Sequence, residues 1–179
     1  MGEPEVAIMR LSFLLAIVVL LSACGSRSEQ TQAASGLSLS SGAFADGQPI
    51  PREFTCDGAG NPPPIQWTKA PLGTKSFVLV MDDPDAPSGI FRHWGVYDLA
   101  GDARSISGGK PAINDFGRTG YGAPCPPRGH GMHRYLFKLY ALDVEKLNLP
   151  ADATVKQVEE EAKRHEIVVA RTTGTYERR

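Results

Sequence analysis

The sequence has no marked excess of either charge, no internal repeat and only three cysteines. Its 179 residues include 19 Lys and Arg against 20 Asp and Glu, and no long run carries one sign. Bulk electrostatics therefore give no reason to expect a nucleic acid as a partner. The length suits one domain with a real core and is short for two domains.

Long helical patterns are also scarce. The chain contains 19 glycines and 14 prolines, too many for a helical bundle because both residues interrupt helices. We therefore expect a turn-rich, mainly β fold. One helix is expected near the C-terminus, where Thr154 and Gln157 have the spacing of a capping box. The apolar residues between Val155 and Ala162 then form one stripe of a helix that reaches about residue 165.

The N-terminus carries an apolar run from Leu11 to Ala23. The run is too short for a stable membrane-spanning helix but suits the central region of a secretory signal. Leu21 to Cys24 resembles the lipobox of bacterial lipoproteins, in which the cysteine receives the lipid. An ordinary cleaved signal with an incidental cysteine remains the alternative. Translation could start at Met1 or at Met9.

These features predict three parts of the chain. Residues 1–23 are expected to be a lipoprotein signal peptide, and residues 24–36 a lipidated cysteine with a flexible spacer. Residues 37–179 should form the folded domain. The domain would be anchored in the cell envelope, on the periplasmic face of a bacterial membrane or on the extracellular face where there is one membrane.

The most informative stretch is MDDPDAPSGIFRHW, residues 81–94. It follows the apolar run FVLVM, which we expect to be a strand that ends at Met81. Pro84 and Pro87 restrict the backbone of the acidic turn that follows this strand. A rigid turn can fix the directions of its carboxylate side chains. His93 should begin the next strand, HWGVYDL, with Gly95, Tyr97 and Leu99 on the same face.

A second chemical cluster lies at HRYLFKLYALD, residues 133–143. If this segment is a strand, its period of two places His133 and Tyr135 on one face of a sheet. An imidazole then lies beside a phenol.

Five stretches together resemble the bacterial branch of the phosphatidylethanolamine-binding protein family, also called Raf kinase inhibitor-like proteins. They are FTCDGAGNPPPIQW, GTKSFVLVMDDPDAPSG, HWGVYDL, GYGAPCPPRGHGMHRYLFKLYALD and GTYER. The resemblance covers roughly residues 37–178. It implies two antiparallel β-sheets of Greek-key type with a few short peripheral helices. It also implies one shallow pocket for phosphate and similar anions, with no metal, cofactor or classical enzyme activity.

Carried over residue by residue, the resemblance implies the following ligand-binding set: Asp83, Asp85, Pro87, His93, Ala123, Cys125, His133 and Tyr135. Ala123 and Cys125 stand where mammalian relatives have glycines. Two imidazoles, a phenol and loop N–H groups could donate to a phosphate. The aspartates would accept from imidazole N–H groups, fix the tautomers and raise the histidine pKa so that the rings stay cationic.

Three further hypotheses remain open. Cys125, His130 and His133, with Cys56, have ligand types and a spacing that could hold zinc. A carboxylate pair or an Asp-His pair could activate water for hydrolysis. Cys56 and Cys125 could instead form a disulfide in an oxidising compartment and join two rim loops.

The sequence therefore predicts a non-enzymatic binding protein that takes a small anionic ligand and is held at the membrane by its lipid anchor. One alternative is an inhibitor or regulator of a client protein, such as an envelope protease, that uses the pocket rim as its contact surface. A weak hydrolase is a third reading. The oligomeric state, a homodimer included, stays open.

Overall fold

The structure is a computed structural model that describes residue 2, residues 36–68 and residues 70–179. The expected signal segment, Cys24 and nearly all of the expected spacer lie outside the described residues. Within the described ranges, no helix is long and apolar enough to cross a membrane. The core described below is built from residues of the 37–179 segment, so we refer to residues 36–179 as the folded domain.

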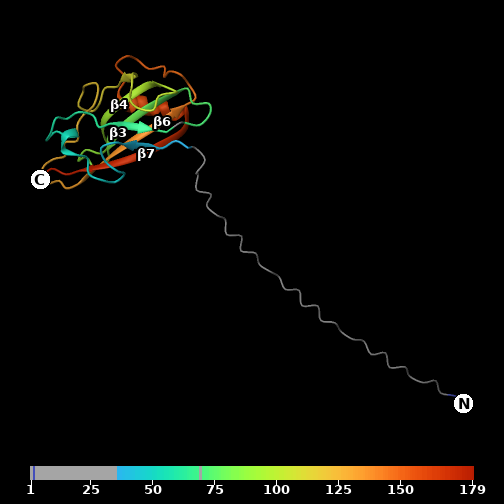
Figure 1. Cartoon of the computed structure of the whole chain (residues 1–179), viewed down its shortest axis with the longest axis horizontal. Helices are drawn as coiled ribbons and strands as arrows, with labels where there is room; N and C mark the ends of the chain where they lie inside the picture. The colour runs from blue at the N-terminus through green and yellow to red at the C-terminus, as the bar shows by residue number, and fades with distance from the viewer. Residues whose placement is uncertain (1, 3–35, 69) are drawn as a thin grey trace. The chain divides into compact units, whose positions relative to one another are not determined.

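Within the residues that the structure describes, seven strands form two antiparallel sheets, as predicted (Figure 1). The small sheet pairs β1 (Leu39–Ser41) with β2 (Ile65–Trp67). The large sheet has the order β5-β4-β3-β6-β7. Its strands are β3 (Ser76–Asp83), β4 (Phe91–Ala100), β5 (Lys110–Pro111), β6 (His133–Leu142) and β7 (Glu166–Tyr176).

The large sheet contains a Greek key. Strands β3, β4 and β5 follow one another as neighbours, and β6 returns through a long connection to pair with the other side of β3. Central β3 is buried along its whole length, because it is covered on both faces. Its side chains alternate between two apolar clusters, with Leu79 in the one beneath the small sheet and Val80 in the one beneath the helix.

The helix α1 spans Val155–Arg164 and begins as the capping box predicts. The Thr154 hydroxyl accepts from the Gln157 N–H, and the Gln157 side chain accepts from the Thr154 N–H. Val155, Val158 and Ala162 are fully buried against the large sheet. An amphipathic stripe of this kind contributes roughly 1.5–3 kcal/mol for each large apolar side chain that it buries.

Two strand boundaries differ from the prediction. Strand β3 continues past Met81 to Asp83, because Asp82 still pairs with Leu136 of β6. Strand β4 begins at Phe91 rather than at His93. A short 3-10 helix, η1 (Arg52–Phe54), lies between β1 and β2.

Strand β3 can hold a buried carboxylate because the helix side of the sheet supplies a cation. Lys138 lies between Asp82 and Glu159 and makes an ion pair with each of them. Burial raises the pKa of Asp82, although the Lys138 ammonium works against that shift. A single isolated carboxylate would be too costly at this depth, and the ion pair with Lys138 offsets part of that cost.

Candidate functional site

The site lies where three neighbouring strands meet at one edge of the large sheet. Asp83 is the last residue of β3, His133 is the first residue of β6, and His93 is near the start of β4. Because these strands are antiparallel, the end of β3 lies beside the beginnings of both neighbours. The fold therefore brings together residues that are far apart in the sequence.

A β-bulge in β4 aims the His93 side chain. Met81 pairs with Trp94 and Asp82 pairs with Arg92, so His93 is the extra residue between two regular pairs. The His93 ring then lies on the same side of the sheet as Trp94, in edge-to-face contact with Tyr135 at 5.2 Å between ring centroids. The prediction that His93 shares one face of the sheet with Gly95 and Tyr97 is therefore wrong.

A second bulge follows further along β4. The pairing skips a residue between Val96 and Leu99, and Asp98 has a φ of 57°. Leu99 consequently packs in the cluster that holds Trp94 and Val96, whereas Tyr97 belongs to the cluster under the helix. Uniform alternation could not anticipate either bulge.

The converging strand ends and two loops enclose a pocket of about 260 Å³. Five of the residues expected to bind ligand line it: Asp83, Pro87, His93, Cys125 and His133. The other lining residues are Ala86, Ser88, Phe91, Phe116, Pro126 and Pro127. Phe91 and Phe116 form an aromatic wall beside His93. The sequence motifs did not identify either residue as part of the pocket.

The two lining histidines are each held through Nδ1. His133 Nδ1 lies 2.7 Å from Asp83 Oδ2, and His93 Nδ1 lies 2.8 Å from the Gly122 carbonyl oxygen. A carbonyl can only accept, so His93 carries its proton on Nδ1. In both rings Nε2 is left as the atom that a ligand could use.

The two imidazoles differ in their electrostatics. Burial lowers the pKa of His93, which outweighs the hydrogen bond to the Gly122 carbonyl and the more distant charge of Asp83. The expectation that aspartates keep both rings cationic is therefore wrong for His93. Asp83 does accept from His133, and the two side chains are almost completely buried together.

Asp85 does not contact either of these histidines. Its carboxylate makes a two-pronged pair with Arg134, with Oδ2 to Nε at 2.8 Å and Oδ1 to Nη2 at 2.7 Å. The hydrogen bonds from Arg134 lower the pKa of Asp85 to about 2. The Asp85 N–H donates to Asp83 Oδ1 at 2.9 Å. The Asp85 carboxylate therefore pairs with Arg134 instead of orienting a ring, and the contact with Asp83 is made by the backbone N–H of residue 85.

Tyr135 and Ala123 are near the pocket but do not line it. Tyr135 is completely buried behind His93, and burial raises the pKa of its phenol. Within the described part of the chain, the Tyr135 hydroxyl has no hydrogen-bond partner. Ala123 is half-buried in the loop between Gly122 and Cys125.

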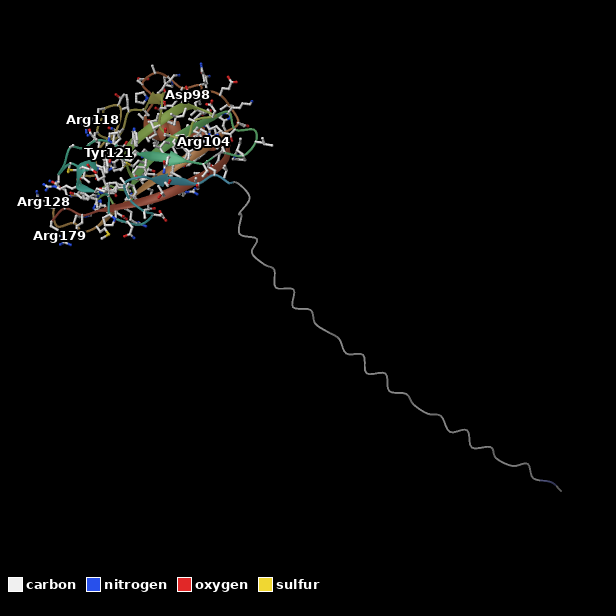
Figure 2. The ribbon with its side chains drawn as sticks, in the orientation of Figure 1. Asp98, Arg104, Arg118, Tyr121, Arg128 and Arg179 are labelled. Carbon is white, nitrogen blue, oxygen red and sulfur yellow. A yellow bond between two sulfur atoms is a disulfide. The ribbon has the colours of Figure 1, made fainter. Side chains whose placement is uncertain are left out.

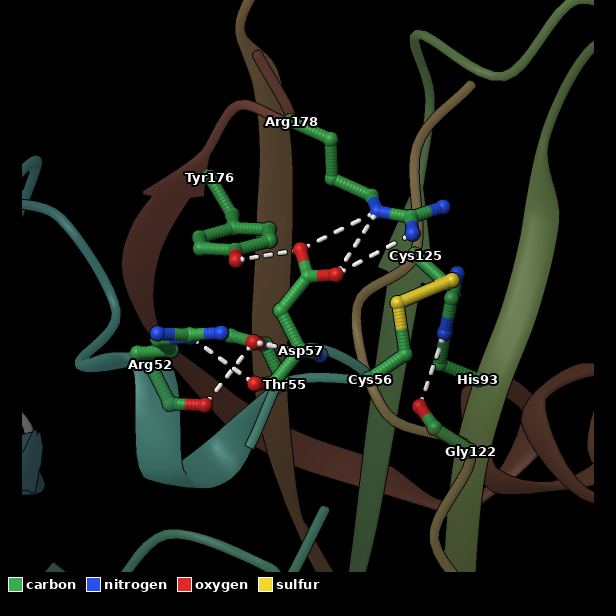
Figure 3. The surroundings of a disulfide bond; sticks show 9 residues. All are labelled: Arg52, Thr55, Cys56, Asp57, His93, Gly122, Cys125, Tyr176 and Arg178. Carbon is green, nitrogen blue, oxygen red and sulfur yellow. Dashed lines mark hydrogen bonds and ion pairs between the residues drawn. A yellow bond between two sulfur atoms is a disulfide. The ribbon is translucent and has the colours of Figure 1, made fainter. Parts of the chain in front are cut away.

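A disulfide between Cys56 and Cys125 joins two rim loops, with a Cα–Cα distance of 5.4 Å (Figure 3). The Cys56 N–H also donates to the Pro124 carbonyl at 3.1 Å. Next to the disulfide, Asp57 accepts from Arg178 at 3.0 Å and from the Tyr176 hydroxyl at 2.8 Å. These hydrogen bonds from Arg178 and Tyr176 lower the pKa of Asp57. The C-terminal segment and both loops thus form one connected rim.

The disulfide leaves neither Cys56 nor Cys125 free as a thiolate ligand. Among the residues that the structure describes, no three His, Cys, Asp or Glu side chains converge as a metal site. His130, the third member of the zinc hypothesis, lies with Nδ1 2.8 Å from His133 Nε2. We had not expected this contact between two histidines three residues apart.

The arrangement resembles part of a hydrolytic site but lacks an engaged nucleophile. Asp83 and His133 have the geometry of a carboxylate that orients a base. Ser88 is the hydroxyl residue of the lining, and no hydrogen bond joins it to either imidazole within the described ranges.

Comparisons with known proteins identify relatives of this chain. The family model described as "Phosphatidylethanolamine-binding protein" matches residues 40–177. A UPF0098 protein of Aquifex aeolicus is 51% identical over 145 residues, which covers 75% of this chain and 85% of that protein. A Mycobacterium tuberculosis protein named as a lipoprotein, LppC, is 42% identical over 151 residues, covering 81% of this chain and 74% of that one.

Two solved structures have a similar fold. The crystal structure of CT736 from Chlamydia trachomatis, described as a PEBP homolog, aligns with a TM-score of 0.74 and 36% identity. It covers 80% of this chain and 99% of that chain. The E. coli protein YbcL, described as a member of the mammalian PEBP family, aligns with a TM-score of 0.76 and 28% identity. This alignment also covers 80% of this chain and 99% of that chain.

Proposed function

The chain belongs to the phosphatidylethanolamine-binding protein family, and we propose that it binds a small phosphate-type anion, free or as a phospholipid headgroup, without turning it over. The observation that carries the proposal is the pair of lining imidazoles whose Nδ1 atoms are already engaged. Pre-organised rings of this kind can present Nε2 to a ligand with little loss of side-chain entropy. The pocket volume of about 260 Å³ suits a headgroup-sized ligand.

The charge of the anion has a local counterpart. When His133 takes up a proton on Nε2, its ring becomes a cation that is stabilised by Asp83 at 2.7 Å. The protonated Nε2 can then donate a charge-assisted hydrogen bond to a phosphate oxygen. Asp83 therefore supports the anion indirectly, through the ring that it orients.

Arg118, beside the pocket, adds longer-range attraction for an anion. Figure 2 shows Arg118, Arg128 and Arg179 at one end of the domain, whereas Asp98 and Arg104 lie toward the other end. The Arg118 guanidinium lies 5.4 Å from the centre of the Phe116 ring, which lines the pocket. Positive groups around a cleft raise the local concentration of an anion and speed its entry.

We also propose that the protein is held in the cell envelope by a lipid on Cys24. The lipobox in residues 21–24 supports this, and so does the name of the Mycobacterium relative. Labelling with a radioactive or alkyne fatty acid in a bacterial host tests it. Label should appear on the wild-type chain and be absent from Cys24→Ser, and label on both variants would disprove the anchor.

The pocket is tested with the folded domain and three probes: inorganic phosphate, phosphoethanolamine and glycerophosphoethanolamine. The first probe represents free phosphate, the second a monoester and the third the diester of a lipid headgroup. Nitrogen-15 NMR of the histidine rings should show saturable shifts of His93 and His133 for at least one probe. The tightest probe identifies the source of the ligand. If none of the probes moves either ring, the function proposed for this pocket is wrong.

Asp83→Asn and Asp85→Asn form a matched pair for this measurement. Asp83→Asn removes the charge that stabilises a cationic His133 and should weaken binding about ten- to a hundredfold, the range for a charge-assisted hydrogen bond. Asp85→Asn removes an equal charge that is already neutralised by Arg134, so its effect should stay below about threefold. Equal losses in both variants would argue against the role of Asp83.

A further inference from the structure

His130 lies on a loop beside the pocket, between two glycines. Gly129 has a φ of 74° and Gly131 a φ of 91°, both in the left-handed region that favours glycine. The His130 residue is exposed, whereas His133 is 1% exposed. His130 therefore reaches from the surface toward a buried ring, and its ring centroid is 5.0 Å from that of His133.

The contact uses the one atom of His133 that a ligand would need. His133 Nδ1 is engaged with Asp83, which leaves Nε2 as its remaining hydrogen-bonding atom. His130 Nδ1 lies 2.8 Å from that Nε2. A ligand that bonds to His133 Nε2 must take the place of His130, because one ring N–H or lone pair makes one strong hydrogen bond.

We propose that His130 is a gate: it closes the anion-binding atom of His133, and an entering anion displaces it. This inference rests on the anion-binding function proposed above and names how that site is regulated. His130 is thus a competitor of the ligand rather than one of its donors.

The loop can release His130 at low cost. Two backbone hydrogen bonds hold the segment, from the His130 N–H to the Pro127 carbonyl at 3.1 Å and from the Gly129 N–H to the Arg178 carbonyl at 3.2 Å. A rotation of the His130 side chain breaks neither of them. The displaced imidazole enters water, which replaces its lost hydrogen bond. The glycine neighbours have open space where a Cβ would lie, so small backbone changes also meet no obstacle.

Acid should open the gate. If both facing nitrogens carry protons, two donors point at each other and the hydrogen bond between the rings is lost. The charged and titratable groups around His133 are Asp83 on β3, His93 on β4 and Tyr135 on β6 itself. On β7, Tyr176 pairs across from His133, but its hydroxyl is engaged with Asp57.

The nearest outer charges form a closed ion pair. Asp85 is paired with Arg134, and this pair changes little over the range in which imidazoles titrate because the pKa of Asp85 is about 2.

The test measures sulfate binding, because sulfate has the shape of phosphate and does not titrate near neutral pH. The folded domain is compared with His130→Ala and with the control His165→Ala. His165 is a surface histidine near Asp143 and Glu161, remote from the pocket. Calorimetry and the ring resonance of His133 report the dissociation constant, and thermal melting checks that both variants fold.

At about pH 7.5, His130→Ala should bind sulfate roughly two- to tenfold more tightly than the wild type, the range that one net hydrogen bond represents. At a lower pH, where both facing nitrogens carry protons, this difference should shrink, because two N–H donors cannot form a hydrogen bond with each other. In the wild type, sulfate should also move the His130 resonance toward that of a solvent-exposed imidazole. His165→Ala should match the wild type at both pH values.

Opposite outcomes overturn the gate. Weaker binding by His130→Ala would make His130 a ligand donor, and unchanged binding would show that its contact with His133 does not compete. Either result, with a wild type that binds, leaves the anion pocket intact. If neither protein binds sulfate or phosphate, both the gate and the function proposed for the pocket are wrong.

Discussion

The disulfide at the pocket rim leads to a quantitative prediction about stability. Cys56 and Cys125 are 69 residues apart in the sequence, and this cross-link limits the freedom of the unfolded chain. In the chain-entropy account, closing a loop of that length stabilises the folded state by about 4 kcal/mol at 25 °C. The double variant Cys56→Ser/Cys125→Ser should therefore lose about that much free energy of unfolding.

The same change should leave the folded rim largely in place. The hydrogen bond from the Cys56 N–H to the Pro124 carbonyl and the cluster of Asp57 with Arg178 do not involve sulfur. Tyr121 adds a further tie, because its hydroxyl donates to the Phe54 carbonyl at 2.8 Å. We expect the loss to come from the unfolded state, with native backbone resonances of the rim loops shifted only near the two substituted residues.

The assay is equilibrium unfolding of the folded domain in urea, followed by circular dichroism. The oxidised wild type, the wild type with reductant and the double-serine variant are compared, and the two thiol-free or reduced forms should agree. The linear dependence on urea gives the free energy in water. A loss below about 1 kcal/mol would refute the unfolded-state reasoning. Widespread changes of rim resonances would instead refute the claim that hydrogen bonds hold the loops.

Three further predictions concern the core. Gly95→Ala should lower the free energy of unfolding by about 1–3 kcal/mol, because the new Cβ would lie 2.8 Å from Val155 Cγ2. A variant that melts at the same temperature as the wild type would contradict this prediction. Tyr140→Phe removes the 2.8 Å hydrogen bond to Glu159 and should lower the free energy of unfolding in urea by about 1–2 kcal/mol. Tyr135→Phe should lower it by less than about 0.5 kcal/mol. The reverse order would show that the Tyr135 hydroxyl has a partner in solution. Burial opposes ionisation of Glu159, but hydrogen bonds from Lys138 and Tyr140 outweigh it and hold its pKa at about 2, below the usual 4.5. Its stabilisation is therefore complete above about pH 4.5 and is lost as the pH falls toward 2, so acid titrations of unfolding free energy should be flatter for Glu159→Gln.

Local rules predicted the elements whose causes are local. The capping box at Thr154 and Gln157 begins α1, and the stripe from Val155 to Ala162 is the face that the helix buries. Period-two geometry places His133 and Tyr135 on one face of β6, and both are buried on that face. These patterns need only the properties of neighbouring residues, so the sequence carries them directly.

The boundaries of β3 and β4 depended on partners from elsewhere in the chain. A run of Asp82, Asp83 and Pro84 ends a strand on local propensity, yet β3 continues because Asp82 pairs with Leu136 of β6 and Asp83 pairs with Phe91 of β4. Tertiary pairing outweighed the local preference there.

By itself, the sequence determined the resemblance to the family, which implied the two-sheet fold, and the residue types at the pocket, because motif identity is a local property. Only the tertiary structure decided which of those residues meet. The bulge at His93 turns its ring toward Tyr135. Asp83 accepts a hydrogen bond from His133, and Asp85 forms an ion pair with Arg134. It also decided that His130 closes on His133. Such choices depend on strand register and on distances between remote segments, which no spacing along the chain encodes.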